Sequence, residues 1–137
     1  MIFINTKKRI EILILIFFIF SGCLSSKRTY STVNVEDVKK SIDLNDGSFI
    51  IIDVRTPEEY RGELGHIKES KLMPLDKLEE LLPLIIDKKH LKVYVICRSG
   101  NRSRTASQIL INAGFEKVFN VSGGMIEWNQ KGYPVER

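Results

Sequence analysis

The sequence predicts an α/β fold built on a central parallel sheet of about five strands, with helices on both faces. Two continuous apolar runs, Phe49–Val54 and Val93–Cys97, have the composition of strands that are covered on both sides. Segments with helical periodicity alternate with these runs, which implies right-handed crossover connections. A chain of 137 residues, of which 43% are hydrophobic and 28% charged, fits one domain with a core of its own.

The first predicted element of the domain is a helix. Asn34 is a good N-cap residue, and Val35, Val38 and Ile42 in the following VEDVKKSI share one helical face. The apolar strand Phe49–Val54 comes next. Helix followed by strand is the alternation that the parallel sheet requires.

A short helix is predicted directly after this strand. Thr56 is a suitable N-cap, Pro57 fits the first helical position, and two acidic residues follow in the first turn. Lys71–Met73 fits a short strand. Leu75–Ile86 then carries leucines at helical spacing until Pro83 disturbs the pattern.

The last third of the chain repeats the alternation. A helix is predicted from Asn101 or Arg102 to Asn112, after the second apolar strand. Val118–Val121 forms a last strand, and a final helix opens at Gly123. Ligands in sheets of this kind bind at the carboxyl ends of the strands, so the end of the second apolar strand is the expected place of a site.

The N-terminus has the layout of a secretory signal. A basic cluster at residues 7–9 precedes the apolar stretch Ile10–Phe20, which only Glu11 interrupts, and the small residues SG stand directly before Cys23. The apolar stretch of 11 residues is short of the roughly 20 that a membrane-spanning helix needs. The SGC end resembles the cleavage site of prokaryotic lipoproteins, whose cysteine is acylated. An uncleaved anchor and a leader cut at another small residue are the alternatives.

We therefore expect a lipoprotein signal peptide at residues 1–22, a tether at 23–31 and the folded domain at 32–137, held by lipid on Cys23 at a membrane outside the cytoplasm. Cleavage would leave 18 basic and 16 acidic residues, a net charge of +2 instead of +4. That charge, without a basic stripe and interleaved aromatics, predicts no nucleic-acid binding. We expect a monomer.

Acylation of Cys23 would leave Cys97 as the remaining thiol, without an intrachain disulfide partner in an oxidising compartment. Cys97 ends a strand, and a glycine-containing polar loop joins it to a helix. Backbone N–H groups at such a helix start favour an anion and lower the pKa of a thiol, so we expect a reactive thiolate. The alternative is a buried, inert cysteine at the end of a strand.

The rest of the loop fits an anionic substrate. Gly100 allows a backbone conformation with positive φ. Arg98 and Arg102 can each hold an oxyanion through two N–H groups. The candidate substrate-binding residues are Arg98, Ser99, Gly100, Asn101, Arg102 and Ser103.

Three motifs together resemble those of the rhodanese-like family, and the resemblance covers about residues 30–135. CRSGNRS at residues 97–103 is similar to the family's active loop, and GGMIEWNQKGYPV at 123–135 to its C-terminal signature. IIDVRTPEEYRGELGHI at residues 51–67 is similar to its first signature. The positions that match within that signature are Asp53, Arg55, Glu59, Tyr60, Gly65 and His66.

The resemblance implies a sulfurtransferase. The Cys97 thiolate would attack the outer sulfur of a donor such as thiosulfate, sulfite would leave, and the persulfide would pass its sulfur to a thiol or cyanide acceptor. Asp53 and Arg55 could act in catalysis, but a brace between loops explains them as well. His66 is a possible general base, although the family places it in a structural turn. No cofactor is implied, and two histidines with two distant cysteines do not have zinc-site spacing.

Two other functions remain open. Some domains of this kind serve as non-catalytic interaction modules, but those usually lack the cysteine that is present here. Cysteine-dependent phosphatases and arsenate reductases form the other class. The phosphatases place an arginine after five intervening residues, where this chain has Ser103, and Arg102 comes one residue earlier.

Overall fold

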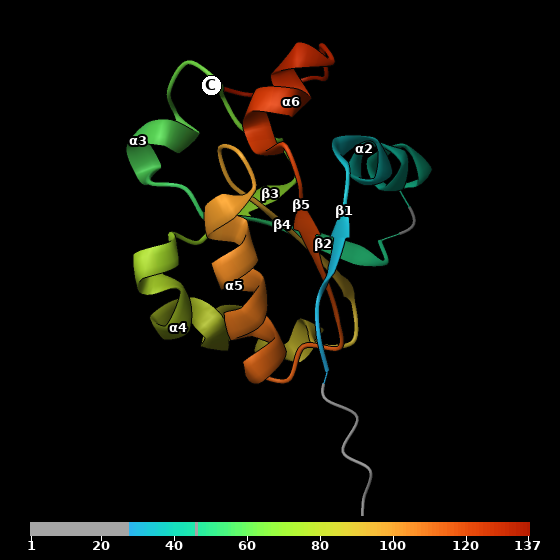
Figure 1. The fold of residues 1–137 in the computed structure, drawn as a ribbon, viewed down its shortest axis with the longest axis vertical. Helices are drawn as coiled ribbons and strands as arrows, with labels where there is room; N and C mark the ends of the chain where they lie inside the picture. Colours follow the sequence, from blue (N-terminus) through green and yellow to red (C-terminus); the bar gives the residue numbers. More distant parts are fainter. Residues whose placement is uncertain (1–27, 46) are drawn as a thin grey trace, which may run out of the picture.

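Five parallel strands form one sheet in the computed structural model, which describes residues 28–45 and 47–137 (Figure 1). The order across the sheet is β1-β5-β4-β2-β3. The strands are β1 (Ser31–Val33), β2 (Phe49–Asp53), β3 (Ser70–Leu72), β4 (Lys92–Ile96) and β5 (Lys117–Val121). The α-helices are α2 (Val35–Leu44), α3 (Pro57–Tyr60), α4 (Leu78–Leu81), α5 (Asn101–Asn112) and α6 (Gly124–Gln130). The predicted fold class is confirmed.

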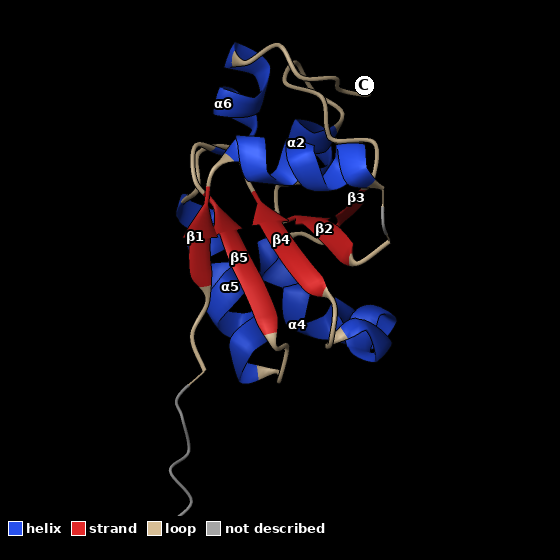
Figure 2. Cartoon of the chain, turned by 90° about the vertical axis from the view of Figure 1, so that its right-hand side faces the viewer, coloured by secondary structure: helices blue, strands red, loops and turns tan. Residues whose placement is uncertain are grey.

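Helices cover both faces of the sheet, as Figure 2 shows. Successive residues of a strand point to opposite faces, and β4 follows this rule. Its Val93 and Val95 belong to one buried cluster, which also contains core residues of α4 and α5. Its Tyr94 and Ile96 belong to a second cluster, with core residues of α2 and α6. Covering on both faces explains why β2 and β4 are apolar throughout.

The local signals placed the starts of α2 and α3 correctly. Asn34 Oδ1 accepts a hydrogen bond from the Asp37 N–H at 3.0 Å, and the Asp37 carboxylate accepts one from the Asn34 N–H. Thr56 and Glu59 form the same reciprocal arrangement at the start of α3. Both helices therefore begin with a capping box, which satisfies N–H groups that have no partner inside a helix.

The structure differs from the sequence prediction in two elements, the helix predicted over residues 75–86 and the strand β1. The predicted helix over residues 75–86 consists of a 3₁₀ turn at Leu75–Lys77, the short α4, and a 3₁₀ helix at Leu82–Lys88. Pro83 lies in the second 3₁₀ helix, where its ring prevents a regular α-helical continuation. Strand β1, which pairs with β5, was not predicted, because three residues are too few to show an alternating pattern.

The predicted signal peptide and Cys23 lie outside the described residues. In the part of the chain that the structure describes, no helix is long and apolar enough to cross a membrane.

Candidate active site

The candidate site lies where β4 ends. Because the strands are parallel, their carboxyl ends meet at one edge of the sheet, and Cys97 directly follows the last residue of β4 there. The loop 97–100 then leads into α5, near the starts of α3 and α6 (Figure 1). Gly100 has φ +97°, a conformation that side-chain-bearing residues resist, so the positive φ predicted for this glycine is present.

The sulfur of Cys97 lies inside the loop. The Gly100 N–H donates to Cys97 Sγ at 3.1 Å, and the Ser103 hydroxyl lies 3.4 Å from the same sulfur. The whole residue is only 1% exposed. Only a small molecule, or one with a projecting terminal atom, can therefore reach the sulfur.

Two opposing effects act on the Cys97 thiol. Burial raises its pKa, because a low-dielectric environment disfavours the charged form. The Ser103 hydroxyl and the backbone N–H groups of Ser103, Ser99 and Gly100 lower the pKa, and together they outweigh burial, so it lies below the ordinary value. The direction of the shift agrees with the expected thiolate.

A buried polar chain continues from the sulfur into the domain. The Ser103 hydroxyl donates to Oδ1 of Asn120, on β5, at 2.6 Å, and both residues are almost completely buried. A serine hydroxyl has a single proton, so it cannot donate to Asn120 and to Cys97 at the same time. Ionisation of Cys97 should therefore draw this proton toward the sulfur and away from Asn120.

The N-terminus of α6 donates hydrogen bonds to the backbone of the Cys97 loop. The Met125 N–H donates to the Cys97 carbonyl at 2.9 Å, and the Ile126 N–H donates to the Arg98 carbonyl at 3.0 Å. A Cβ atom on Gly124 would lie 2.4 Å from the Cys97 carbonyl oxygen, and Gly124 has φ +56°. The second glycine of the GGM motif thus permits the contact between α6 and the Cys97 loop.

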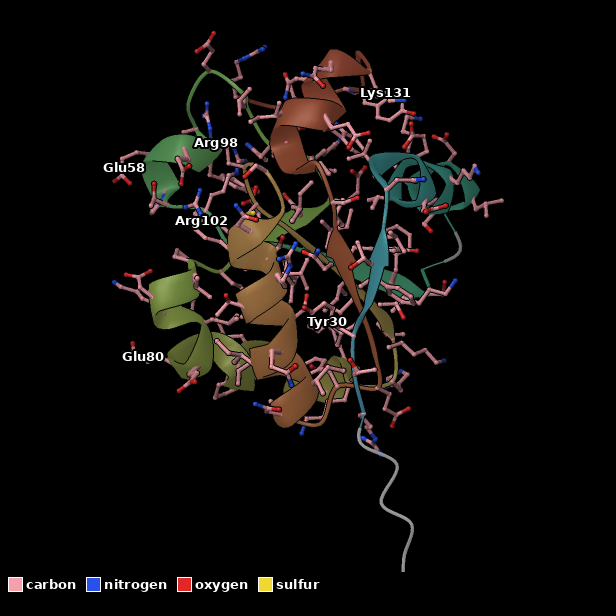
Figure 3. All side chains as sticks on the ribbon, viewed as in Figure 1. Tyr30, Glu58, Glu80, Arg98, Arg102 and Lys131 are labelled. Carbon is pink, nitrogen blue, oxygen red and sulfur yellow. The ribbon has the colours of Figure 1, made fainter. Side chains whose placement is uncertain are left out.

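The two loop arginines have different surroundings. Figure 3 shows Arg98 and Arg102 on the side of the loop that faces α3. Arg98 is exposed, whereas Arg102 forms a two-bond ion pair with Glu59 of α3. Nη1 and Nη2 of Arg102 each lie 2.7 Å from a different carboxylate oxygen of Glu59. This pair lowers the pKa of Glu59 to about 2, chiefly through the hydrogen bonds from Arg102.

Two clefts of about 340 Å³ each lie beside this ion pair. Glu59 lines the first together with Arg98, and Arg102 lines the second together with Leu75. Arg55 lines both. The Glu59–Arg102 pair therefore stands between two openings at the rim of the loop.

Asp53 and Arg55 form a fully buried brace beneath the rim. Arg55 Nη2 lies 2.6 Å from Asp53 Oδ2 and also donates to the Gly65 carbonyl at 2.8 Å. Arg55 Nη1 donates to the Glu59 carbonyl at 3.2 Å. The guanidinium thus connects the end of β2 with α3 and with the loop that follows it. This geometry is that of the brace considered from the sequence.

His66 contacts the C-terminal segment. Its ring stacks on Tyr60 with a centroid separation of 3.7 Å, and its Nδ1 lies 3.0 Å from the Tyr60 carbonyl. Its backbone exchanges two hydrogen bonds of 2.8 Å with Glu136. None of these partners belongs to the Cys97 loop, which favours the structural role over that of a base.

Two residues of the site were not singled out from the sequence. Glu59 was noted only as a helix-start acid and as a motif match, and Asn120 was not considered. Each meets its partner across the fold, Glu59 across 43 residues of sequence and Asn120 across 17. In the described part of the chain, no group of three His, Cys, Asp or Glu side chains is arranged to hold a metal ion.

A glycine-containing loop that surrounds a buried cysteine, at the carboxyl edge of a five-stranded parallel sheet, defines a class of α/β domains. Within this class, residues 34–131 match the family model of the rhodanese-like domain. The chain belongs to the rhodanese-like domain family.

Named relatives differ in function. A Schizosaccharomyces pombe protein described as "Putative thiosulfate sulfurtransferase, mitochondrial" is 34% identical over 123 residues, which cover 77% of this chain and 84% of that protein. A tRNA uridine(34) hydroxylase of Salmonella heidelberg is 33% identical over 119 residues. The match covers 78% of this chain but only 33% of the hydroxylase, so the similarity concerns one part of a longer protein.

Solved structures agree with the fold. A rhodanese-related protein from Thermoplasma volcanium is 32% identical, with a TM-score of 0.67 over 78% of this chain and 98% of the other. A rhodanese-like domain protein from Staphylococcus aureus is 29% identical, with a TM-score of 0.66 over 78% of this chain and 99% of the other.

Proposed function

We propose that this protein is a sulfurtransferase that moves a sulfane sulfur from a small anionic donor, such as thiosulfate, to a thiol or cyanide acceptor. The observation that carries the proposal is the Cys97 sulfur inside its loop, 3.1 Å from the Gly100 N–H, with the pKa of the thiol lowered by hydrogen bonds that outweigh burial. The relative named as a thiosulfate sulfurtransferase supports the same activity.

The reaction would have two steps. The Cys97 thiolate attacks the outer sulfur of thiosulfate; a new S–S bond forms, and the bond to the sulfonate sulfur breaks, so that sulfite leaves with the electron pair. An acceptor thiolate or cyanide then attacks the terminal sulfur and regenerates the Cys97 thiolate. The loop N–H groups are suited to hold the anionic terminal sulfur between these steps.

The nearly complete burial of Cys97 favours such a donor. Thiosulfate presents its reactive sulfur as a terminal atom, while its charged oxygens can stay at the rim beside Arg98. We propose the loop residues 98–103 as the binding site for these oxygens and for the persulfide.

Mass spectrometry of the intact protein tests the proposal. After treatment with thiosulfate, wild-type protein should gain one sulfur atom on Cys97, and addition of cyanide should remove it and produce thiocyanate. Cys97→Ser should lose this gain and all transfer with an unchanged circular dichroism spectrum, because the substitution removes the nucleophile and little volume. Substantial turnover in the folded Cys97→Ser protein would refute the mechanism.

We also propose that the mature protein is a lipoprotein, anchored outside the cytoplasm by acylation of Cys23. The support is the basic cluster, apolar stretch and SGC end of the N-terminal sequence. Cys23→Ala should abolish lipid attachment and either release the protein from the membrane fraction or block processing. Unchanged membrane attachment together with a normal mature mass would show that lipid on Cys23 is not the anchor.

A further inference from the structure

We propose that the Glu59 carboxylate is an internal anion that competes with the sulfur donor for Arg102, and so sets the affinity of the site for small dianions. This inference rests on the proposed sulfurtransferase function, and it gives Glu59 a role in selecting the donor. Glu59 would act as a positioning residue, because it reaches the donor only through Arg102.

The geometry of the pair is that of an occupied anion site. Each terminal nitrogen of Arg102 donates to its own carboxylate oxygen of Glu59, at 2.7 Å in both cases. A planar guanidinium binds a carboxylate and an oxyanion such as a sulfonate through the same pair of N–H groups. A donor that uses this edge of Arg102 must therefore displace Glu59.

The position of Arg102 relative to the sulfur makes this competition relevant. The charges of Cys97 and Asp53 help to raise the pKa of Arg102, after the larger effect of the hydrogen bonds to Glu59. Arg102 also directly precedes Ser103 in the first turn of α5, and the Ser103 hydroxyl lies 3.4 Å from the Cys97 sulfur. The oxygens of a thiosulfate whose outer sulfur approaches Cys97 would come under the influence of the same guanidinium.

The pair can open because it is not buried. The side chain of Arg102 is 35% exposed and that of Glu59 is 28% exposed. Water can therefore solvate either side chain when the pair separates, which a fully buried pair does not allow. The fully buried Asp53–Arg55 pair, by contrast, is not available for exchange with a substrate.

Protonation cannot relieve the competition near neutral pH. The pKa of Glu59 is about 2, so the carboxylate stays charged under ordinary conditions. Exchange with a donor, or a substitution of Glu59, is then required to free Arg102.

Glu59→Gln separates competition from structural support. Glutamine keeps the length of the side chain and an oxygen that can accept the Thr56 N–H bond, so the start of α3 is preserved. It removes the charge that holds Arg102. Because charge-assisted hydrogen bonds are roughly twice as strong as neutral ones, we expect KM for thiosulfate to fall about fivefold, with kcat little changed.

Glu58→Gln is the matched control. Glu58 neighbours Glu59 on α3, is exposed, and projects away from the loop arginines (Figure 3). This variant removes the same charge from the same helix without touching the pair. An equal fall in KM for Glu58→Gln would mean that a general change in local charge is responsible, and would overturn the proposal.

A second measurement does not depend on turnover. Sulfate is a dianion without a transferable sulfur, and its binding should slow the alkylation of Cys97 by iodoacetamide. We expect Glu59→Gln to be protected at about fivefold lower sulfate concentration than wild type. Tighter sulfate binding without sulfur transfer by any form would refute the proposed function and leave the competition supported.

A clear result would overturn the inference. In this result, Glu59→Gln binds neither thiosulfate nor sulfate more tightly than wild type does. In that case Glu59 supports the site and does not compete with the donor. Should Glu59→Gln fail to fold, Glu59→Asp keeps the charge but is too short to bind both nitrogens of Arg102. That variant should show a smaller gain in sulfate affinity, and no gain would overturn the proposal.

Discussion

The base and the rim of the candidate site both contain an arginine–carboxylate pair, but only the side chains of the rim pair have substantial solvent exposure. At the base, the Asp53–Arg55 side chains are 0% and 1% exposed, and Arg55 also donates to two backbone carbonyls. At the rim, the Glu59–Arg102 side chains are 28% and 35% exposed. Burial therefore makes the base pair a fixed part of the fold, whereas the rim pair can exchange its partner.

The largest expected effect tests this comparison through stability. Arg55→Ala should lower the free energy of unfolding by about 3 to 5 kcal/mol, because it leaves the Asp53 carboxylate buried without its partner. Arg102→Ala should cost about 0 to 1 kcal/mol, because Glu59 can turn to water. Urea unfolding of both variants measures the difference, and equal losses would contradict the distinction between base and rim.

The contrast also explains how far the sequence could predict the site. Cys97 and its loop were predicted because strand, glycine turn and helix start are neighbours in the sequence, so local rules describe them. The pairing of Arg102 with Glu59 could not be predicted, because it joins a helix start to a residue 43 positions away. The same limit applied to Asn120, which reads as an ordinary strand residue until β5 is placed beside α5.

In the fold, too, the elements defined by local sequence patterns were predicted, and those that depend on distant pairing were not. The strands β2 and β4 and the starts of α2 and α3 follow from apolar runs and capping residues, which act over a few positions. Strand β1 depends on pairing with β5, and a segment of three residues has no local pattern that predicts this pairing. The elements that carry the site were thus the predictable ones, and their mutual contacts were not.

A smaller effect is expected from Ser103 of α5, whose hydroxyl lies beside the Cys97 sulfur. Ser103→Ala removes the hydroxyl between Cys97 and Asn120, so the opposing effect of burial should prevail more and the pKa of Cys97 should rise. The loss of a partner for buried Asn120 should also cost about 1 to 3 kcal/mol. Alkylation of Cys97 by iodoacetamide as a function of pH measures the first effect.

Ser107→Ala is the matched control for this prediction. The Ser107 hydroxyl is buried in the same helix, and within the described residues it has no hydrogen-bond partner. Its removal should leave the reactivity of Cys97 unchanged, and the stability unchanged or slightly higher. A pH profile of Ser103→Ala that coincides with that of Ser107→Ala would show that the Ser103 hydroxyl does not stabilise the thiolate.

The smallest expected effect concerns the rim pair in acid. The pKa of Glu59 is lowered from 4.5 to about 2 in the folded protein, so the stabilisation from its ionised form is fully present above the unfolded-state pKa. It should be lost as the pH falls from 4.5 toward about 2. The unfolding free energies of wild type and Glu59→Gln should therefore differ by a constant amount above about pH 5 and converge in acid. In an Arg102→Ala background the two curves should run nearly parallel, because the main cause of the lowered pKa is gone.

Since Glu59 stays ionised throughout the neutral range, the ratio of the thiosulfate KM values of wild type and Glu59→Gln should not change there with pH. A ratio that followed the titration of Cys97 instead would assign the effect of Glu59 to the thiol and not to Arg102.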